Sequence, residues 1–94
     1  MIVEISVVPL GYRSLSSFVA EVLKELEVAS LKYELNPMGT VLELESFEEL
    51  GKLLERIESK LRELGSERNY YVVKVDTKSG AMEDKVRSVK EKLK

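Results

Sequence analysis

The stretch "ELNPMGTVLEL", residues 34–44, decides the fold, because it sets a turn between two short runs in which apolar and polar residues alternate. Asn36, Pro37 and Gly39 occupy the first, second and fourth positions of a four-residue segment, as a type I β-turn favours. Alternation with a period of two residues is typical of β-strands. The stretch therefore predicts a β-hairpin whose tip is either a turn alone or also the rim of a binding site.

A helix is predicted directly after the hairpin. Ser46 and Glu49 have the spacing of a capping box, in which the serine hydroxyl accepts a hydrogen bond from the amide of Glu49 and the glutamate reaches back. Gly65 is suited to end this helix, because glycine readily adopts the left-handed conformation of a C-terminal cap. The apolar stripe between these two signals consists of Phe47, Leu50, Leu54, Ile57, Leu61 and Leu64.

Further elements are predicted on both sides of this segment. Residues 1–9 alternate and predict a strand, and residues 14–30 place apolar side chains at helical spacing. Ser14 or Ser16 is the predicted N-cap of that helix. The remaining predicted elements are a strand over residues 69–77 and a short amphipathic helix over residues 82–93.

The resulting order is β-α-β-β-α-β-α. Two βαβ crossovers around a hairpin, in a chain of 94 residues, indicate an α+β protein with a ferredoxin-like sandwich. This architecture is a four-stranded antiparallel sheet with two helices on one face, and here it carries an additional C-terminal helix. We expect residues 1–94 to form a single domain.

Composition excludes several classes of function. The formal net charge of -2 gives no reason to expect binding to nucleic acid or to an anionic membrane. The chain contains neither cysteine nor histidine, so most catalytic templates cannot be assembled, and no metal site or cofactor is expected. No apolar stretch approaches the roughly 20 residues that span a bilayer, and the N-terminus has no basic leader. We therefore expect a cytoplasmic protein.

The two faces of the predicted sheet differ in polarity. The face under the helices is all apolar and comprises Val3, Ile5, Val7, Leu31, Tyr33, Leu35, Leu42, Leu44, Tyr71, Val73 and Val75. The opposite face mixes apolar and ionisable side chains and comprises Ile2, Glu4, Ser6, Val8, Lys32, Glu34, Asn36, Val41, Glu43, Tyr70, Val72, Lys74 and Asp76. Such a face suits a subunit interface or a ligand, and the alternative is a solvated sheet surface.

Two functions known on ferredoxin-like folds can be tested against the sequence. RNA-recognition domains stack bases on aromatic residues of their central strands, whereas the first strand here has none and the third carries Glu43 and Glu45. An acylphosphatase-type site would use an arginine in the first loop and an asparagine after the second strand. Arg13 and Asn36 occupy comparable regions, although the glycine-rich loop expected before the arginine is missing.

Four segments carry a family resemblance: "MIVEISVVPLG", "SLSSFVAEV", "LKYELNPMGTVLE" and "EDKVRSVKEKL". With them the chain resembles the thiamine-binding protein family of small ferredoxin-like domains, over essentially its whole length. The resemblance implies a homotetramer or dimer formed through the sheets. It also implies binding of thiamine, or of its hydroxymethylpyrimidine part, without catalysis, near the segment from Pro37 to Thr40.

The resemblance implies a set of ligand-binding residues, whose chemistry suits a pyrimidine. Hydrogen-bonding groups, apolar walls and a carboxylate for the cationic ring of thiamine are all present. Strict alternation places Thr40 on the helix side of the sheet unless a bulge re-aims it. The predicted ligand-binding residues are Glu4, Ser6, Asn36, Met38, Gly39, Thr40 and Tyr70.

Three functional hypotheses follow. The first is a non-enzymatic homo-oligomer that binds thiamine or a related pyrimidine. The second is a structural or regulatory assembly module that has no small ligand and whose open sheet face serves only to pair subunits. The third is a small hydrolase of the acylphosphatase type.

Overall fold

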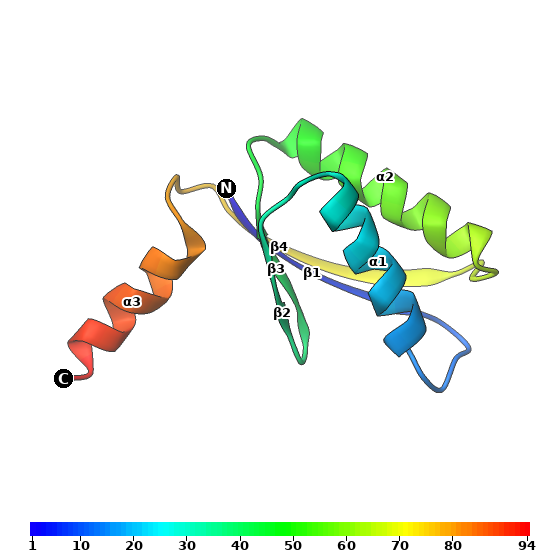
Figure 1. Cartoon of the computed structure of the whole chain (residues 1–94), viewed down its shortest axis with the longest axis horizontal. Coiled ribbons are helices and arrows are strands. Elements are labelled where there is room, and N and C mark those ends of the chain that lie inside the picture. The colour runs from blue at the N-terminus through cyan, green and yellow to red at the C-terminus, as the bar shows by residue number, and fades with distance from the viewer.

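Four strands form one antiparallel sheet in the order β2-β3-β1-β4, with α1 and α2 packed on one face (Figure 1). The computed structural model describes residues 1–94. The observed architecture confirms the predicted α+β, ferredoxin-like arrangement. Its elements are β1 (Ile2–Pro9), α1 (Ser16–Val28), β2 (Tyr33–Asn36), β3 (Gly39–Glu43), α2 (Phe47–Glu63), β4 (Asn69–Asp76) and α3 (Met82–Lys92).

The hydrophobic core lies between the sheet and the two covering helices. Alternate residues of β1 and β3 supply one side of it, and the apolar stripes of α1 and α2 supply the other. The buried residues of this core are Val3, Ile5, Val22, Leu26, Leu42, Leu44, Leu50, Leu53, Ile57 and Leu61. The predicted inward face of the central strands is therefore confirmed.

Two positions predicted to be covered by the helices are exposed. Leu35 of β2 is 54% exposed, and Val75 of β4 is 36% exposed. Both belong to edge strands of the sheet, and Leu35 lies close to the end of the hairpin. The two helices cover the middle of the sheet and leave these outer positions open.

The capping signals gave one correct and one wrong prediction. Ser46 accepts a hydrogen bond from the Glu49 amide at 3.2 Å, so the predicted serine cap is confirmed. The Glu49 carboxylate reaches back as predicted, but it accepts from the amide of Glu45 at 2.8 Å, one residue before the Ser46 amide that a standard capping box uses. The prediction that Ser14 or Ser16 caps α1 is wrong. The N-cap position is Leu15, without a side-chain hydrogen bond, because the hydroxyls of Ser14 and Ser16 lie 3.2 Å apart and bond to each other.

The predicted hairpin is present and has a two-residue loop. Asn36 pairs with Gly39, and only Pro37 and Met38 lie between the strands. Neither loop residue has a positive φ, which excludes the type I′ and II′ turns common in such short hairpins and fits the predicted type I turn. The proline fixes the backbone of the tip, because its ring restrains φ.

β1 is longer than the hairpin beside it, and this mismatch positions the candidate site. All eight residues of β1 pair with β4, from Ile2 opposite Asp76 to Pro9 opposite Asn69. The pairing of β1 with β3 stops at Ile5 opposite Thr40. The second half of β1 therefore has a partner strand on one side only.

α3 lies apart from the sandwich, beyond the end of the sheet where the N-terminus lies (Figure 1). Met82 is its buried residue, whereas Val86, Val89 and Leu93 are exposed. Ion pairs tie its first turns to the rest of the chain, from Lys32 to Glu83 at 2.6 Å and from Asp76 to Lys85. α3 is thus held by one apolar anchor and a few charges.

Candidate functional site

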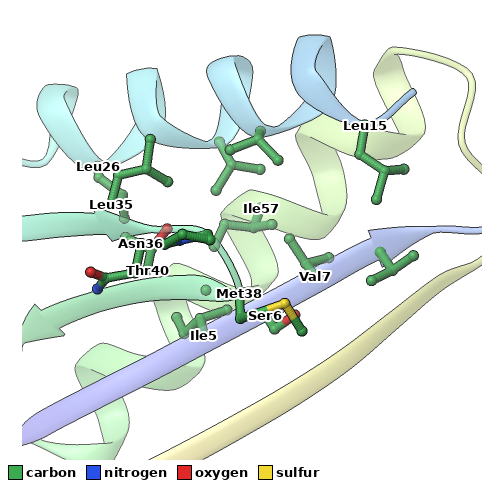
Figure 2. Close-up of a pocket in the computed structure, with 15 residues that line it drawn as sticks. Ile5, Ser6, Val7, Leu15, Leu26, Leu35, Asn36, Met38, Thr40 and Ile57 are labelled. Carbon is green, nitrogen blue, oxygen red and sulfur yellow. The ribbon is translucent and has the colours of Figure 1, made fainter.

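A pocket of about 300 Å³ lies between the hairpin tip, the second half of β1 and the inner face of α1. It forms because β3 ends before β1 does, so no strand fills the space that α1 spans. Leu15, at the N-cap position of α1, and Val7 of β1 extend into this space from opposite sides (Figure 2). The lining residues are Ile5, Ser6, Val7, Val8, Leu15, Val19, Val22, Leu26, Leu35, Asn36, Pro37, Met38, Gly39, Thr40 and Ile57.

The lining is apolar except for three uncharged side chains. Ser6, Asn36 and Thr40 are its polar lining residues, and no ionisable residue is among them. Ligand pockets are typically apolar hollows with a few polar groups that fix orientation. The arrangement can therefore enclose a small, flat, largely uncharged molecule and hydrogen-bond to its edge.

Five of the seven predicted ligand-binding residues meet at this pocket. Asn36, Met38 and Gly39 belong to the hairpin tip and its flanks, Ser6 lies on β1, and Thr40 of β3 pairs with β1. These five residues are Ser6, Asn36, Met38, Gly39 and Thr40. Met38 is 86% exposed and stands at the mouth of the pocket.

Thr40 lies on the helix side of the sheet, as strict alternation predicts. It pairs with Ile5 on β1 and with Leu35 on β2, and it is 9% exposed. No bulge re-aims it toward Glu4, whose partner on β3 is Val41. Thr40 and Ser6 nevertheless line the same pocket, because the pocket opens where β3 ends and β1 continues.

The other two predicted residues do not line the pocket. Glu4 lies on the open face, where its carboxylate is 3.9 Å from the ammonium group of Lys74. The Glu4 side chain lies against Gly39. A Cβ added at Gly39 would be 3.3 Å from Cγ of Glu4. Tyr70 is 60% exposed on β4, opposite Val8. The predicted carboxylate and the predicted aromatic wall therefore lie outside the pocket.

Sequence reasoning missed the wall that α1 contributes. Leu15, Val19 and Val22 line the pocket, although their helical spacing marks them only as part of an inward apolar face. Val7 was placed with the core for the same reason. One signal for the pocket was available in the sequence. The predicted strand over residues 1–9 is longer than the strand that follows Gly39, so part of it has no partner on that side.

The structure does not bring together the arginine and the asparagine that the acylphosphatase-type hydrolase hypothesis requires. Asn36 lines the pocket, but Arg13 lies in the exposed loop between β1 and α1 and does not. Tyr12 fixes part of that loop elsewhere, through a hydrogen bond to the carbonyl of Gly65 at 3.2 Å and an edge-to-face contact with Phe18.

No group of three or more aspartate and glutamate side chains is arranged to hold a metal ion. None of the three helices combines the length and the apolar character needed to cross a membrane.

A second polar cluster joins α2 to the start of β4, away from the pocket. The Glu58 carboxylate accepts hydrogen bonds from the Tyr71 hydroxyl at 2.8 Å and from the Asn69 amide at 2.9 Å. Arg62 donates to the same carboxylate at 2.7 Å. The Tyr71 hydrogen bond, followed by those of Asn69 and Arg62, lowers the pKa of Glu58. Burial and the neighbouring Glu58 raise the pKa of Tyr71, which keeps its hydroxyl a donor.

Comparisons with known proteins agree with this fold. Residues 3–90 match the family described as thiamine-binding protein. A UPF0045 protein of Methanothermobacter thermautotrophicus is 39% identical over 95 residues, which cover 96% of each chain.

Two solved structures are also similar. A hypothetical protein of Methanocaldococcus jannascii has a TM-score of 0.78 and 28% identity, over 96% of this chain and 95% of that one. A protein of Thermotoga maritima, described as a putative thiamine biosynthesis or salvage protein, has a TM-score of 0.80 and 24% identity, over 94% and 96% of the two chains.

Proposed function

Since the chain belongs to the thiamine-binding protein family, we propose that it binds thiamine or the hydroxymethylpyrimidine part of thiamine, without catalysis, in the pocket beside the hairpin tip. The observation that carries the proposal is that one apolar hollow is lined by the polar residues Ser6, Asn36 and Thr40 together with the hairpin tip. A pyrimidine needs hydrogen-bond partners at its edge and apolar walls on its faces, and this pocket offers both.

The rigid hairpin tip favours binding. Pro37 restrains the loop in the unbound protein, so Asn36 and Gly39 lose little conformational freedom when a ligand arrives. Met38 is exposed at the mouth, and the flexible thioether of a methionine can close over a flat ring. In this proposal the residues that form the turn also form the rim of the binding site.

The proposal excludes turnover of the bound molecule. With no histidine or cysteine in the chain and no ionisable side chain in the pocket, no group is placed to transfer a proton to or from the ligand. Thiamine incubated with an excess of the protein should be recovered unchanged by chromatography. Release of free pyrimidine or thiazole would identify an enzyme instead.

Isothermal titration of the purified protein with thiamine and with hydroxymethylpyrimidine tests the proposal. Saturable heat at one site per chain, with at least one of the two molecules, is the expected result. No heat with either would leave the assembly module as the better explanation. The exposed Tyr70 and Val72 on the open sheet face favour that second candidate, because they suit a contact between subunits.

We also propose that the protein acts as a homo-oligomer in the cytoplasm. Each chain leaves one edge of β4 unpaired over eight residues, and long apolar edge strands readily pair with another chain. The same edge adjoins the exposed side chains of the open face. Neither nucleic acid nor membrane is a proposed partner.

A further inference from the structure

The outer edge of β2 carries main-chain groups that no strand pairs with. β2 is the first strand in the sheet order, so β3 is its one neighbour. The carbonyl of Lys32 accepts a hydrogen bond from the amide of Glu43 at 3.3 Å, on the side of β3. Because main-chain groups of an antiparallel strand point alternately to its two sides, those of Tyr33 and Leu35 point outward. Each of these residues therefore offers a free donor and a free acceptor along this edge.

An open groove of about 560 Å³ lies between this edge and α1. The small residues Ser16 and Ala20 of α1 leave room beside Leu35, which is 54% exposed. The Tyr33 hydroxyl donates to the Glu27 carboxylate at 2.7 Å, so the same side of α1 still faces β2 one turn beyond the groove. The lining residues are Ser16, Val19, Ala20, Leu23, Leu35, Asn36 and Pro37.

The groove is a different surface from the pocket beside the hairpin tip. The two hollows lie on either side of the hairpin end and share four lining residues, Val19, Leu35, Asn36 and Pro37. Ser16, Ala20 and Leu23 line the groove alone. A change confined to these three positions therefore acts on the groove and leaves the lining of the pocket as it is.

An extended peptide is the occupant that this combination fits. Free main-chain groups along a sheet edge pair with an added strand, and an apolar groove beside the edge takes alternate side chains of that strand. Residues opposite each other in an antiparallel pair share a face. The residues opposite Tyr33 and Leu35 would therefore point toward α1, where Ala20 and Leu23 suit aliphatic side chains.

Glu34 determines the charge that the added strand should carry. Its side chain is exposed on the open face of β2 and forms no ion pair. Lys32, on the same face, is already paired with Glu43 at 2.8 Å and with Glu83 at 2.6 Å. Opposite charges stabilise a cross-strand pair and like charges destabilise it. The residue opposite Glu34 should therefore be basic.

The same carboxylate disfavours a second copy of β2 as the occupant. Two β2 strands related by a two-fold axis would use all of their free main-chain groups when Tyr33 of one chain lies opposite Leu35 of the other. That register sets Glu34 directly opposite its own copy. Like charges in that position are destabilising, so the edge suits a strand of a different sequence.

We infer that the outer edge of β2 and its groove against α1 form a docking site for an extended segment of another protein, in which aliphatic and basic residues alternate. The segment adds an antiparallel strand to the sheet beside β2. Its aliphatic side chains enter the groove over Ala20, and a basic side chain lies opposite Glu34. Because the edge is short, the contact is small, as in transient complexes.

Fluorescence anisotropy with a labelled peptide of about six alternating lysine and valine residues tests the inference. The protein should bind this peptide saturably, with one peptide per chain. A peptide with glutamate in place of lysine should bind roughly tenfold more weakly or worse, because it sets like charges opposite Glu34. Absence of saturable binding of the lysine peptide at millimolar concentration would overturn the inference.

A third peptide separates strand pairing from attraction between charges. Methylation of its valine main-chain nitrogens keeps every charge and side chain, but it removes the donors that would face Tyr33 and Leu35. This peptide should also bind roughly tenfold more weakly than the unmethylated lysine peptide. Equal affinities would mean that no strand is added, and the inference would be wrong.

Two variants of α1 test the groove. Ala20→Leu fills it and should weaken binding of the lysine peptide roughly tenfold. Ser17→Leu adds similar bulk at an exposed position outside the groove and should bind as the wild type does. Circular dichroism checks that both are folded. Equal affinities of the two variants would contradict the inference. So would a lower molecular mass of Ala20→Leu in sedimentation equilibrium, because the groove would then hold a second copy of this chain.

Hydrogen exchange on the unaltered protein locates the added strand without any variant. The amides of Tyr33 and Leu35 should exchange more slowly when the lysine peptide is bound, because the peptide takes the place of solvent at their N–H groups. The amide of Glu34 faces β3 and serves as the internal reference. Unchanged exchange at Tyr33 and Leu35 with saturating peptide would refute the docking site.

Discussion

Ser6 and Thr40 reach the same pocket from opposite faces of the sheet. Ser6 belongs to the open face of β1, and Thr40 pairs with Ile5 and Leu35 on the helix face. Within a complete sheet two such side chains would be separated by the main chain. They meet here because the pocket opens at the point where β3 ends and β1 continues.

The Thr40 hydroxyl should therefore contribute to affinity. Thr40→Val keeps the shape of the side chain and replaces the hydroxyl by a methyl group. If the hydroxyl bonds the ligand inside the pocket, its loss should weaken binding by about 1 to 3 kcal/mol. Calorimetry with hydroxymethylpyrimidine measures the difference, and the near-normal circular dichroism of the variant shows that the fold persists.

Glu4→Gln is the matched control at the same scale. Glu4 lies on the open face and does not line the pocket, so this substitution should leave the affinity for the ligand unchanged. A large loss of affinity in Glu4→Gln combined with none in Thr40→Val would move the site to the open face, where the sequence alone had placed the carboxylate.

Individual residues show how far the sequence predicts the site. Pro37 and Gly39 predict the hairpin from sequence alone, because their conformational preferences are local. Thr40 follows strict alternation, which is also local. The position of Glu4 relative to the cavity does not follow from local sequence. It depends on where β3 ends relative to β1 once β1, β2 and β3 have paired. No residue type signals that outcome.

At the level of elements, the Glu58 cluster fastens α2 to β4. Its hydrogen bonds keep the pKa of the Glu58 carboxyl below its ordinary value. A carboxyl group whose pKa is depressed by folding adds to the free energy of unfolding above the unfolded-state pKa, about 4.3 for glutamate. That contribution is lost as the pH falls through the lower, folded-state pKa.

Acid unfolding tests this role. The free energy of unfolding should fall more steeply between about pH 5 and pH 3 in the wild type than in Glu58→Gln, whose amide does not titrate. Glu63→Gln is the control on the same helix, since its side chain is 72% exposed, and it should behave as the wild type does. Parallel curves for wild type and Glu58→Gln would show that the cluster contributes nothing that depends on pH.

α3 should open independently of the sandwich, because Met82 is its buried residue. Met82→Ala removes that anchor and should accelerate amide hydrogen exchange throughout residues 82–92, while the core strands keep their protection. Val89→Ala, at a position that is 60% exposed on the same helix, should leave exchange unaltered. Similar exchange in both variants would mean that the ion pairs alone hold the helix.

The elements differ in how well local sequence predicts them. The serine cap at Ser46 and the turn at Pro37 were predicted correctly because their partners lie within a few residues. The N-cap of α1 was not, because Ser14 and Ser16 bond to each other instead of to the helix. The exposure of Leu35 depends on how far α1 extends over an edge strand, which is a property of the assembled layers.

At the scale of the whole molecule, exposed apolar surface suggests association. Tyr70 and Val72 on the open face are 60% and 46% exposed, beside the free edge of β4. Burying a few hundred Å² of such surface at roughly 25 cal/mol per Å² supplies several kcal/mol toward association. Sedimentation equilibrium at micromolar concentration should therefore show a dimer or a tetramer.

Val72→Lys should shift this equilibrium toward the monomer, because it places a charge in the proposed contact. Its secondary structure should not change, since Val72 faces away from the core. A wild-type protein that sediments only as a monomer would rule out the oligomer, and the pocket would then have to bind its ligand within one chain.

The central claim, that the ligand lies in the pocket beside the hairpin tip, is tested most directly by two-dimensional amide NMR during titration with hydroxymethylpyrimidine. The account predicts saturable shifts that cluster at Ser6, Val7, Gly39, Thr40 and Val19, all of which line that pocket. Shifts confined to the open face around Glu4, Tyr70 and Val72, or none at saturating concentration, would contradict it.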